Sequence, residues 1–188
     1  MAVLSQELRE TAEAIKARYP AGRRRSAILP LLYLVQSVEG WVTREGLREV
    51  AGLLGLTTAE VEAVASFYTM IRLRPTGKHV VAVCTNLACA LRGAGSVLAA
   101  AREALGTENG SVTEDGMFTL HEEECLGACD AAPVVTVNFA NFDRVSAEGI
   151  VELVEKLRRG ETPQPSRGTF PGSFSDASRT LAGLGDAE

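Results

Sequence analysis

The four cysteines of this 188-residue chain fall into two short pairs that lie far apart along the sequence. Four residues separate Cys84 from Cys89, three separate Cys125 from Cys129, and 35 residues lie between the two pairs. Thiols placed in this way form a ligand set for a metal centre only if the fold brings both loops together. The spacing therefore constrains the fold, because a structure that uses these thiols must place residues 84–89 beside residues 125–129.

Composition and charge predict an ordinary globular protein in a reducing compartment. The hydrophobic share of 46% and the charged share of 23% are typical of globular domains. A net charge of −5 argues against nucleic acid or anionic lipid as the main partner. No apolar run approaches the roughly 20 residues that span a bilayer, and the N-terminus lacks the features of a signal or transit peptide. We therefore expect a cytoplasmic protein with no direct membrane insertion, in which clustered cysteines indicate metal before disulfides.

The first 70 residues show the periodicity of four short amphipathic helices. Residues that start or stop helices mark the boundaries: Pro20, Gly40, Thr43, Gly55 and the capping-box pair Thr57 and Glu60. Four such helices in a row predict a small helical bundle over residues 1–74.

From His79 onward the pattern changes to short strands and helices. The predicted elements in chain order are a strand at 79–84, a helix at 91–105, a short strand at 117–120, a strand at 133–137, its hairpin partner at 142–145 and a helix at 147–159. The order β-α-β-β-β-α, with cysteines directly after the first strand, is that of a thioredoxin-like domain. We therefore predict an α+β chain, in which the helical bundle is followed by a thioredoxin-like α/β domain over residues 75–160.

Residues 161–188 are rich in Pro, Gly, Ser and Thr and contain few apolar side chains. Such a segment cannot bury enough apolar surface to fold alone. We predict an extended or flexible tail, in which Phe170 and Phe174 are suited to docking on a partner. A solvated tail without a partner is the alternative.

The cysteine spacing favours an iron–sulfur centre over two other uses of thiols. Zinc knuckles favour two residues between paired cysteines, whereas the gaps here are four and three residues. A redox dithiol is disfavoured because no CxxC sequence is present. We predict one 2Fe–2S cluster, with Cys84 and Cys89 on one iron and Cys125 and Cys129 on the other. A zinc-stabilised interaction module stays open as the alternative.

Residues beside the cysteines bear on redox potential and on the type of reaction. A carboxylate roughly 8 Å away at an effective dielectric of about 20 disfavours an added electron by on the order of 2 kcal/mol, which is about 90 mV. Glu122, Glu123 and Glu124 lead directly into Cys125 and predict a low potential, unless the run is merely a solvated strand end. His79 and His121 are expected to be ordinary rather than ligating residues. No dinucleotide or phosphate loop is present, so we expect electron transfer without hydride transfer.

Several stretches resemble one known family. They are Cys84-TNLA-Cys89, ECLGACDAAP at 124–133, RRSAILPLLYLVQSVEGWV, VASFYTM and RPTGKHVVAVC. These stretches are similar to the E subunit of NADH:quinone oxidoreductase, respiratory complex I, and the similarity covers roughly residues 15–160.

The resemblance implies one 2Fe–2S cluster held by the four matching cysteines, with no catalytic residue on this chain. It also implies a hetero-oligomer with an F-type subunit that carries FMN, the NADH site and a 4Fe–4S cluster, within the larger peripheral arm of complex I. The chain would then exchange an electron with the partner's flavin, as part of a multisubunit oxidoreductase with no complete active site of its own. The expected location is cytoplasmic, peripheral to the inner face of the bacterial plasma membrane. The equivalent diaphorase subunit of an NAD-linked formate dehydrogenase or hydrogenase is the alternative within the same chemistry.

Overall fold

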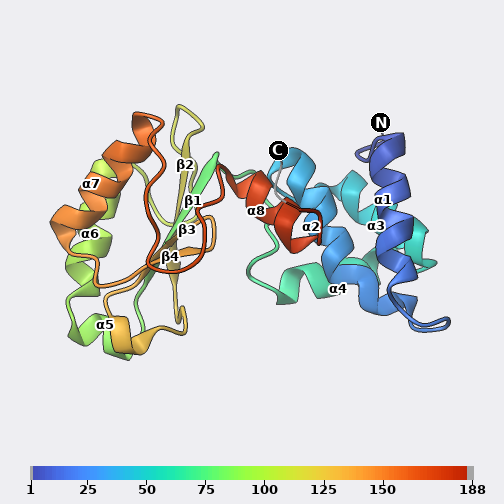
Figure 1. Cartoon of the computed structure of the whole chain (residues 1–188), viewed down its shortest axis with the longest axis horizontal. Helices are drawn as coiled ribbons and strands as arrows, with labels where there is room; N and C mark the ends of the chain where they lie inside the picture. The colour runs from blue at the N-terminus through green and yellow to red at the C-terminus, as the bar shows by residue number, and fades with distance from the viewer. Residues whose placement is uncertain (1, 186–188) are drawn as a thin grey trace. The chain divides into compact units, whose positions relative to one another are not determined.

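The structure is a computed structural model that describes residues 2–185 (Figure 1). Contacts within the chain divide it into two compact units, Met1–Pro75 with Ser175–Glu188, and Thr76–Phe174. Below they are called the helical unit and the sheet unit. Among the described residues, no single helix has the length and apolar character needed to cross a membrane. One pair of consecutive helices, Arg44–Leu54 and Thr58–Phe67, has that length and character only when the two are taken together, and the pair is bent by 116° at its junction.

The helical unit begins with four α-helices whose ends follow local capping rules. They are α1 (Gln6–Ala17), α2 (Ile28–Glu39), α3 (Arg44–Leu54) and α4 (Thr58–Phe67), and a 3-10 turn at Arg24–Ala27 precedes α2. The Thr43 hydroxyl accepts a hydrogen bond from the Gly46 N–H, and Thr57 and Glu60 form a reciprocal capping box. Gly40 ends α2 with a left-handed backbone (φ 77°). The capping residues expected from the sequence therefore act as predicted.

One buried polar side chain, Gln36 on α2, connects three segments of the helical unit. Its amide nitrogen donates to the Met70 carbonyl at 3.2 Å and to the Ser178 hydroxyl at 3.1 Å. Its amide oxygen accepts the Arg72 N–H at 2.7 Å. Because a buried amide is costly unless its hydrogen bonds are made, these contacts fix the residues after α4 and the last helix against α2.

The sheet unit contains a four-stranded mixed sheet in the order β2-β1-β3-β4. The strands are β1 (His79–Cys84), β2 (Phe118–Glu123), β3 (Val135–Val137) and β4 (Ala140–Phe142). β1 runs parallel to β2 and antiparallel to β3, and β4 is antiparallel to β3. The strands and the two long helices follow one another in the predicted order β-α-β-β-β-α, so the α+β fold class is confirmed.

Two helices, α6 (Ala94–Leu105) and α7 (Ala147–Arg158), lie side by side on one face of this sheet (Figure 1). Between them and the strands lies an apolar core that includes Val81, Val83, Phe118, Leu120, Val135, Val97, Ala101, Ile150 and Val154. A separate short helix, α5 (Leu87–Leu91), comes before α6. The sequence predicted a single helix from residue 91 and placed Gly93 inside it. That prediction was wrong, because Gly93 (φ 94°) takes a left-handed backbone that separates the two helices.

The hairpin from β3 to β4 turns at Asn138 and Phe139, which both have positive φ (51° and 69°). Two such residues give a turn whose twist matches that of the flanking strands. The Asn138 side chain is buried, and its oxygen accepts the Val80 N–H at 2.9 Å. Its nitrogen donates to the ring Nδ1 of His79 at 3.1 Å. Asn138 therefore holds the hairpin against β1.

Residues 161–174 differ from the predicted extended or flexible tail, because they run along the sheet, pack Phe170 against its core and bury Phe174. The Ser166 N–H donates to the Asn141 carbonyl at 2.7 Å, which covers the edge strand β4. Phe170 lies 6.2 Å from His79 and from Phe142, measured between ring centroids. Phe174 is only 1% exposed.

After this segment, α8 (Phe174–Leu181) leads into the helical unit, where Ala182 is buried in the core. Composition misled the prediction, because the apolar surface against which Phe170, Phe174 and Ala182 pack comes from the rest of the chain. The expectation that Phe170 and Phe174 dock on a partner is therefore corrected, since both pack within this chain.

Truncating Phe174 should destabilise the protein far more than truncating an exposed phenylalanine. Phe174→Ala removes a buried ring that packs 5.3 Å from Phe139, and should lower the free energy of unfolding by about 3 kcal/mol or more. Phe67→Ala is the matched control, because Phe67 is 78% exposed, and should change it by less than about 1 kcal/mol. Urea unfolding followed by circular dichroism checks both, and equal losses would show that residues 161–174 contribute little to stability.

Acidification should destabilise the protein through His79. Burial, and secondarily the charge of Lys78, lower the pKa of His79 from 6.5 to about 4. Between about pH 4 and pH 6.5 the imidazole of His79 is therefore protonated in the unfolded chain but neutral in the folded protein. The stability that neutral His79 contributes is complete above about pH 6.5 and is lost as the pH falls toward 4. Between pH 7 and pH 5 the parent should lose about 1–2 kcal/mol more than His79→Gln, which does not titrate in this range. Urea unfolding at the two pH values measures this difference, and parallel losses in both proteins would contradict the assignment.

Candidate metal centre

The parallel pairing of β1 with β2 brings the two cysteine loops together. Parallel neighbours end at the same edge of a sheet, and Cys84 and Glu123 are register partners at that edge. The Thr85 N–H donates to the Glu123 carbonyl at 2.9 Å, and the Cys84 thiol donates to the Glu124 carbonyl at 3.6 Å. The chain therefore enters both loops from adjacent positions, although the loops are far apart in sequence.

The four thiols approach one another as two pairs. The Cys84 and Cys89 thiols hydrogen-bond each other, as do those of Cys125 and Cys129. Cys84 and Cys89 are buried, whereas Cys125 and Cys129 are exposed. Within residues 2–185, no three side chains of His, Cys, Asp or Glu are placed to hold a single ion jointly.

Electrostatics at the thiols shows what kind of group the site can accept. Burial, followed by the hydrogen bond that its thiol donates to the Cys84 sulfur, raises the pKa of Cys89. The charge of Cys125 is the main cause of the raised pKa of Cys129. A bound metal cation reverses both effects, because its charge favours the thiolate form. Two thiolate pairs are the donor set that a 2Fe–2S group requires, so the residues present fit it.

The backbone of Val134 contacts both cysteines of the buried pair. Its carbonyl accepts the Cys84 N–H at 3.1 Å, and its N–H donates to the Cys89 sulfur. A hydrogen bond donated to sulfur favours the thiolate. The Val145 N–H in turn donates to the Pro133 carbonyl at 3.0 Å and holds this segment in place. Sequence reasoning missed Val134, because its role depends on backbone atoms that every residue except proline possesses in full.

Small apolar residues surround the buried thiol pair. The cluster that contains Cys84 and Cys89 includes Ala94, Ala128, Ala132 and Val134, with Ala88 and Leu126 packed against it. Gly127 takes a left-handed backbone (φ 72°) in the second loop. Ala128, the next residue in this loop, belongs to the buried cluster. Cys89 lies in the first turn of α5, whose N-cap is Asn86.

The acidic run before Cys125 is divided among different environments. Glu122 is exposed and forms an ion pair with Arg102 at 3.6 Å. Glu123 is half-buried, and its carbonyl accepts from Thr85. Glu124 is exposed directly before the loop that carries Cys125 and Cys129. The three carboxylates therefore differ in how strongly each can act on a charge held by the four cysteines.

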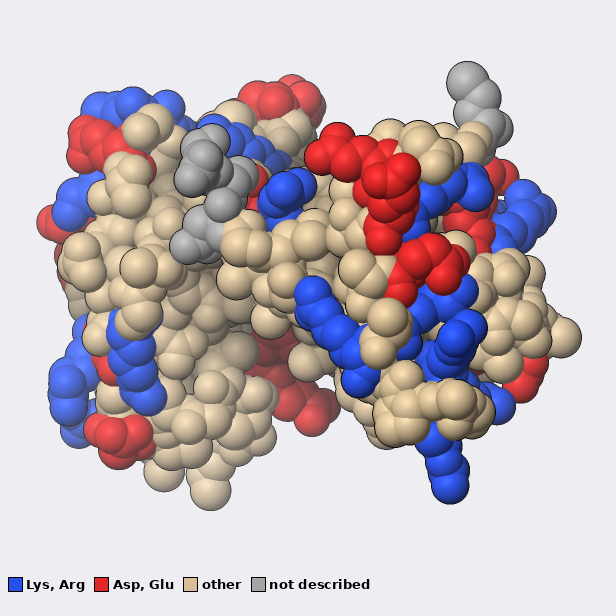
Figure 2. Space-filling view, turned by 45° about the vertical axis from the view of Figure 1, so that its right-hand side comes forward, with Lys and Arg blue, Asp and Glu red and all other residues tan. Residues whose placement is uncertain are grey.

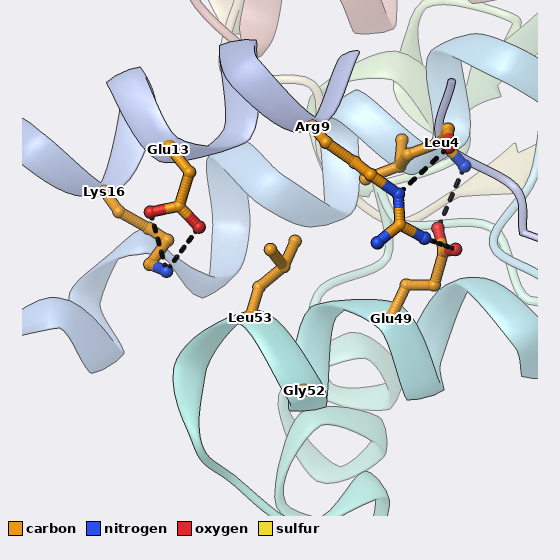
Figure 3. Close-up of a pocket in the computed structure, with 7 residues that line it drawn as sticks. All are labelled: Leu4, Arg9, Glu13, Lys16, Glu49, Gly52 and Leu53. Carbon is orange, nitrogen blue, oxygen red and sulfur yellow. Dashed lines mark hydrogen bonds and ion pairs between the residues drawn. The ribbon is translucent and has the colours of Figure 1, made fainter. Parts of the chain in front are cut away.

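A cavity of about 360 Å³ in the helical unit is a further concave candidate (Figure 3). Its charged side chains neutralise one another, since Arg9 pairs with Glu49 at 2.6 Å and Lys16 pairs with Glu13 at 2.8 Å. Glu49 also accepts the Leu4 N–H at 2.9 Å. These contacts tie the N-terminal segment to α3, so the cavity wall has a structural role.

Comparison with known proteins identifies relatives of this chain. Residues 12–158 match the family described as "Thioredoxin-like [2Fe-2S] ferredoxin". The E subunit of the NADH-quinone oxidoreductase of Mycobacterium tuberculosis is 50% identical over 175 residues, which cover 93% of this chain and 69% of the relative. Subunit 2 of the NADH-quinone oxidoreductase of Thermus thermophilus is 43% identical over 146 residues, which cover 77% of this chain and 81% of the relative.

Among solved structures, a chain of the NAD+-reducing [NiFe]-hydrogenase in the H2-reduced state superposes with a TM-score of 0.63 at 23% identity. The match covers 70% of this chain but only 22% of the hydrogenase chain. At 23% identity it shows that the two chains share a fold and nothing more.

The family match spans the second half of the first helix, the whole sheet and both cysteine loops. The two thiol pairs at the sheet edge supply the donor set for which that family is named. This chain therefore belongs to the thioredoxin-like [2Fe-2S] ferredoxin family.

Proposed function

We propose that Cys84, Cys89, Cys125 and Cys129 hold one 2Fe–2S cluster, and that the chain is an E-type electron-transfer subunit of NADH:quinone oxidoreductase. The observation that carries the proposal is the meeting of both thiol pairs at one sheet edge, in a chain 50% identical to an E subunit of that complex. When bound, such a cluster accepts and releases one electron at a time.

The residues around the thiols have distinct tasks in this function. Cys84 and Cys89 form the inner pair, in an apolar setting where the Val134 N–H stabilises thiolate charge. Cys125 and Cys129 form the outer pair, which is exposed. The outer pair is therefore the side that an electron-exchange partner can approach most closely.

The proposed partner is an F-type subunit that carries FMN and the NADH site, within the peripheral arm of complex I. The relatives in Mycobacterium and Thermus bear the names of complex subunits, which supports work in an assembly. On the face seen in Figure 2, acidic and basic side chains are interspersed rather than gathered in one basic patch, consistent with a protein partner rather than nucleic acid. The proposed location is the inner face of the bacterial plasma membrane, reached through the complex.

A second candidate within the same chemistry is the diaphorase subunit of an NAD-linked hydrogenase or formate dehydrogenase. The superposition on the NAD+-reducing hydrogenase favours it at the level of the fold. The relatives from NADH-quinone oxidoreductase are far more similar in sequence, at 50% and 43% identity. We therefore prefer the complex I assignment, and co-purification with a quinone-reducing rather than a hydrogen-oxidising assembly tests it.

Removing any one of the four cysteines should abolish the cluster. Each Cys→Ala variant leaves one iron with a missing thiolate, and should lose most of its iron, acid-labile sulfide and visible absorption after anaerobic purification. His121→Ala is the matched control, since His121 lies in β2 close to the same edge, and should retain all three. A Cys→Ala variant with full iron, full sulfide and an unchanged spectrum would contradict the ligand set. A colourless parent protein with stoichiometric zinc would instead support the interaction-module alternative.

Neutralising Glu124 should raise the midpoint potential. Glu124→Gln removes a negative charge beside the ligand loop and should raise the potential by on the order of tens of millivolts. The double variant Glu122→Gln/Arg102→Gln is the control, because it removes both charges of an ion pair and leaves the local net charge unchanged. EPR-monitored redox titration measures both proteins. If Glu124→Gln shifts the potential no more than the control does, solvent screens the Glu124 carboxylate fully.

A further inference from the structure

Residues 161–174, called the strap below, hold the chain where it leaves β4 (Figure 1). The Ser166 hydroxyl accepts the Asp143 N–H at 2.8 Å, and the Ser166 N–H donates to the Asn141 carbonyl at 2.7 Å. One guanidinium nitrogen of Arg167 donates to both carboxylate oxygens of Asp143, at 3.0 and 3.2 Å. Two neighbouring residues of the strap therefore fix both the backbone and the side chain of Asp143.

The strap is anchored on both sides of these contacts. Pro163 and Pro165 are buried before Ser166, and Phe170 packs against the core of the sheet unit after it. Proline has few backbone conformations to lose on folding, so this part of the strap is ordered at little entropic cost. Only 15% of the Asp143 side chain is exposed, so its ion pair is screened less than one at the open surface.

The two residues after Asp143 bind the segment 131–133. The Arg144 N–H donates to the Ala131 carbonyl at 2.8 Å, and the Val145 N–H donates to the Pro133 carbonyl at 3.0 Å. Arg144 makes its contact from a left-handed backbone (φ 52°), which a residue with a side chain keeps only where its surroundings hold it. The contacts of the strap at Asp143 lie directly beside this residue and supply that hold.

The segment held in this way connects the outer thiol pair to the inner one. It follows Cys129 and leads into Val134, whose N–H donates to the Cys89 sulfur and whose carbonyl accepts the Cys84 N–H. A hydrogen bond donated to sulfur favours added negative charge at an iron–sulfur site. The position of Val134 therefore bears on the redox potential, and that position depends on residues 131–133.

We propose that Ser166 and Arg167 are positioning residues for the iron–sulfur site, and that they act by fixing Asp143 so that the Val134 N–H stays on the Cys89 sulfur. This inference rests on the proposed function and gives the C-terminal segment a task in it. Releasing the strap should loosen residues 131–134, speed the loss of iron and lower the midpoint potential.

The test uses the full-length chain, purified anaerobically with its iron and sulfide. The strap variant Asp143→Asn/Ser166→Ala/Arg167→Gln removes the ion pair and the hydroxyl acceptor without changing the net charge. The control variant Glu45→Gln/Arg48→Gln/Ser66→Ala removes an exposed ion pair and an exposed serine hydroxyl bond from the helical unit, also without changing the net charge.

Three measurements compare these proteins with the parent. In the strap variant, hydrogen exchange at residues 131–134 should be about threefold faster or more, as should iron release to a chelator. Its midpoint potential, from EPR-monitored titration, should fall below that of the parent, because the donor to the Cys89 sulfur is held less firmly. The control variant should match the parent in all three. The conservative variant Ser166→Thr/Arg167→Lys, which keeps the hydroxyl and the cation, should stay within about twofold of the parent rates.

The other outcomes separate this inference from the proposed function. A parent without iron and sulfide would overturn both. A parent that contains them, with a strap variant no different from the control variant, would overturn the role of the strap alone. Faster exchange with unchanged iron release and potential would show that the strap only stabilises the fold, and would also overturn it. If the strap variant does not fold, Ser166→Ala alone takes its place, with the same directions of change expected and Ser66→Ala as its control.

Discussion

The parallel pairing of β1 with β2 is the constraint on which the site depends. Strands paired in this way lie about 5 Å apart and end at the same edge, so Cys84 and the residues just before Cys125 become neighbours despite their separation in sequence. The crossover through α6 makes that pairing available, and the antiparallel β3 then brings Val134 against the buried thiols. Burial of Cys89, and the charge of Cys125 beside Cys129, raise the pKa of each thiol and so disfavour its ionisation. Metal binding relieves this and thereby couples the stability of the loops to the bound group.

Local signals predicted much of the helical unit and most of the element order, because they act within a few residues. The capping box of Thr57 and Glu60 and the left-handed Gly40 needed no tertiary information. The error at Gly93 arose because apolar side chains continue at helical spacing across it, while the backbone break depends only on φ. The folded C-terminal segment was missed for a different reason. Its aromatic side chains are few, and their burial depends on a core built by residues more than 30 positions earlier, such as Phe139 beside Phe174.

The thiols could be proposed as a site from sequence because metal-binding chemistry lies in the side chain, and the spacing of Cys125 and Cys129 is visible in the letters. Contributions that act through geometry were not visible. The pairing of Arg102 with Glu122 joins a helix to a strand, and no sequence pattern connects residues of opposite charge at that distance. The double contact of Val134 belongs to backbone atoms.

The unequal burial of the two thiol pairs has a thermodynamic consequence for assembly. The inner pair is already in an apolar setting with a backbone donor, so partner binding changes its surroundings little. The outer pair and the carboxylates of Glu124 and Asp130 are hydrated, and a docked subunit replaces that water with its own groups. Basic groups on the partner favour an added electron, whereas apolar groups disfavour it. If binding of a partner shifts the reduction potential of the bound group, then reduction shifts the affinity for that partner by the same free energy. Reduction and association are therefore coupled through the outer pair.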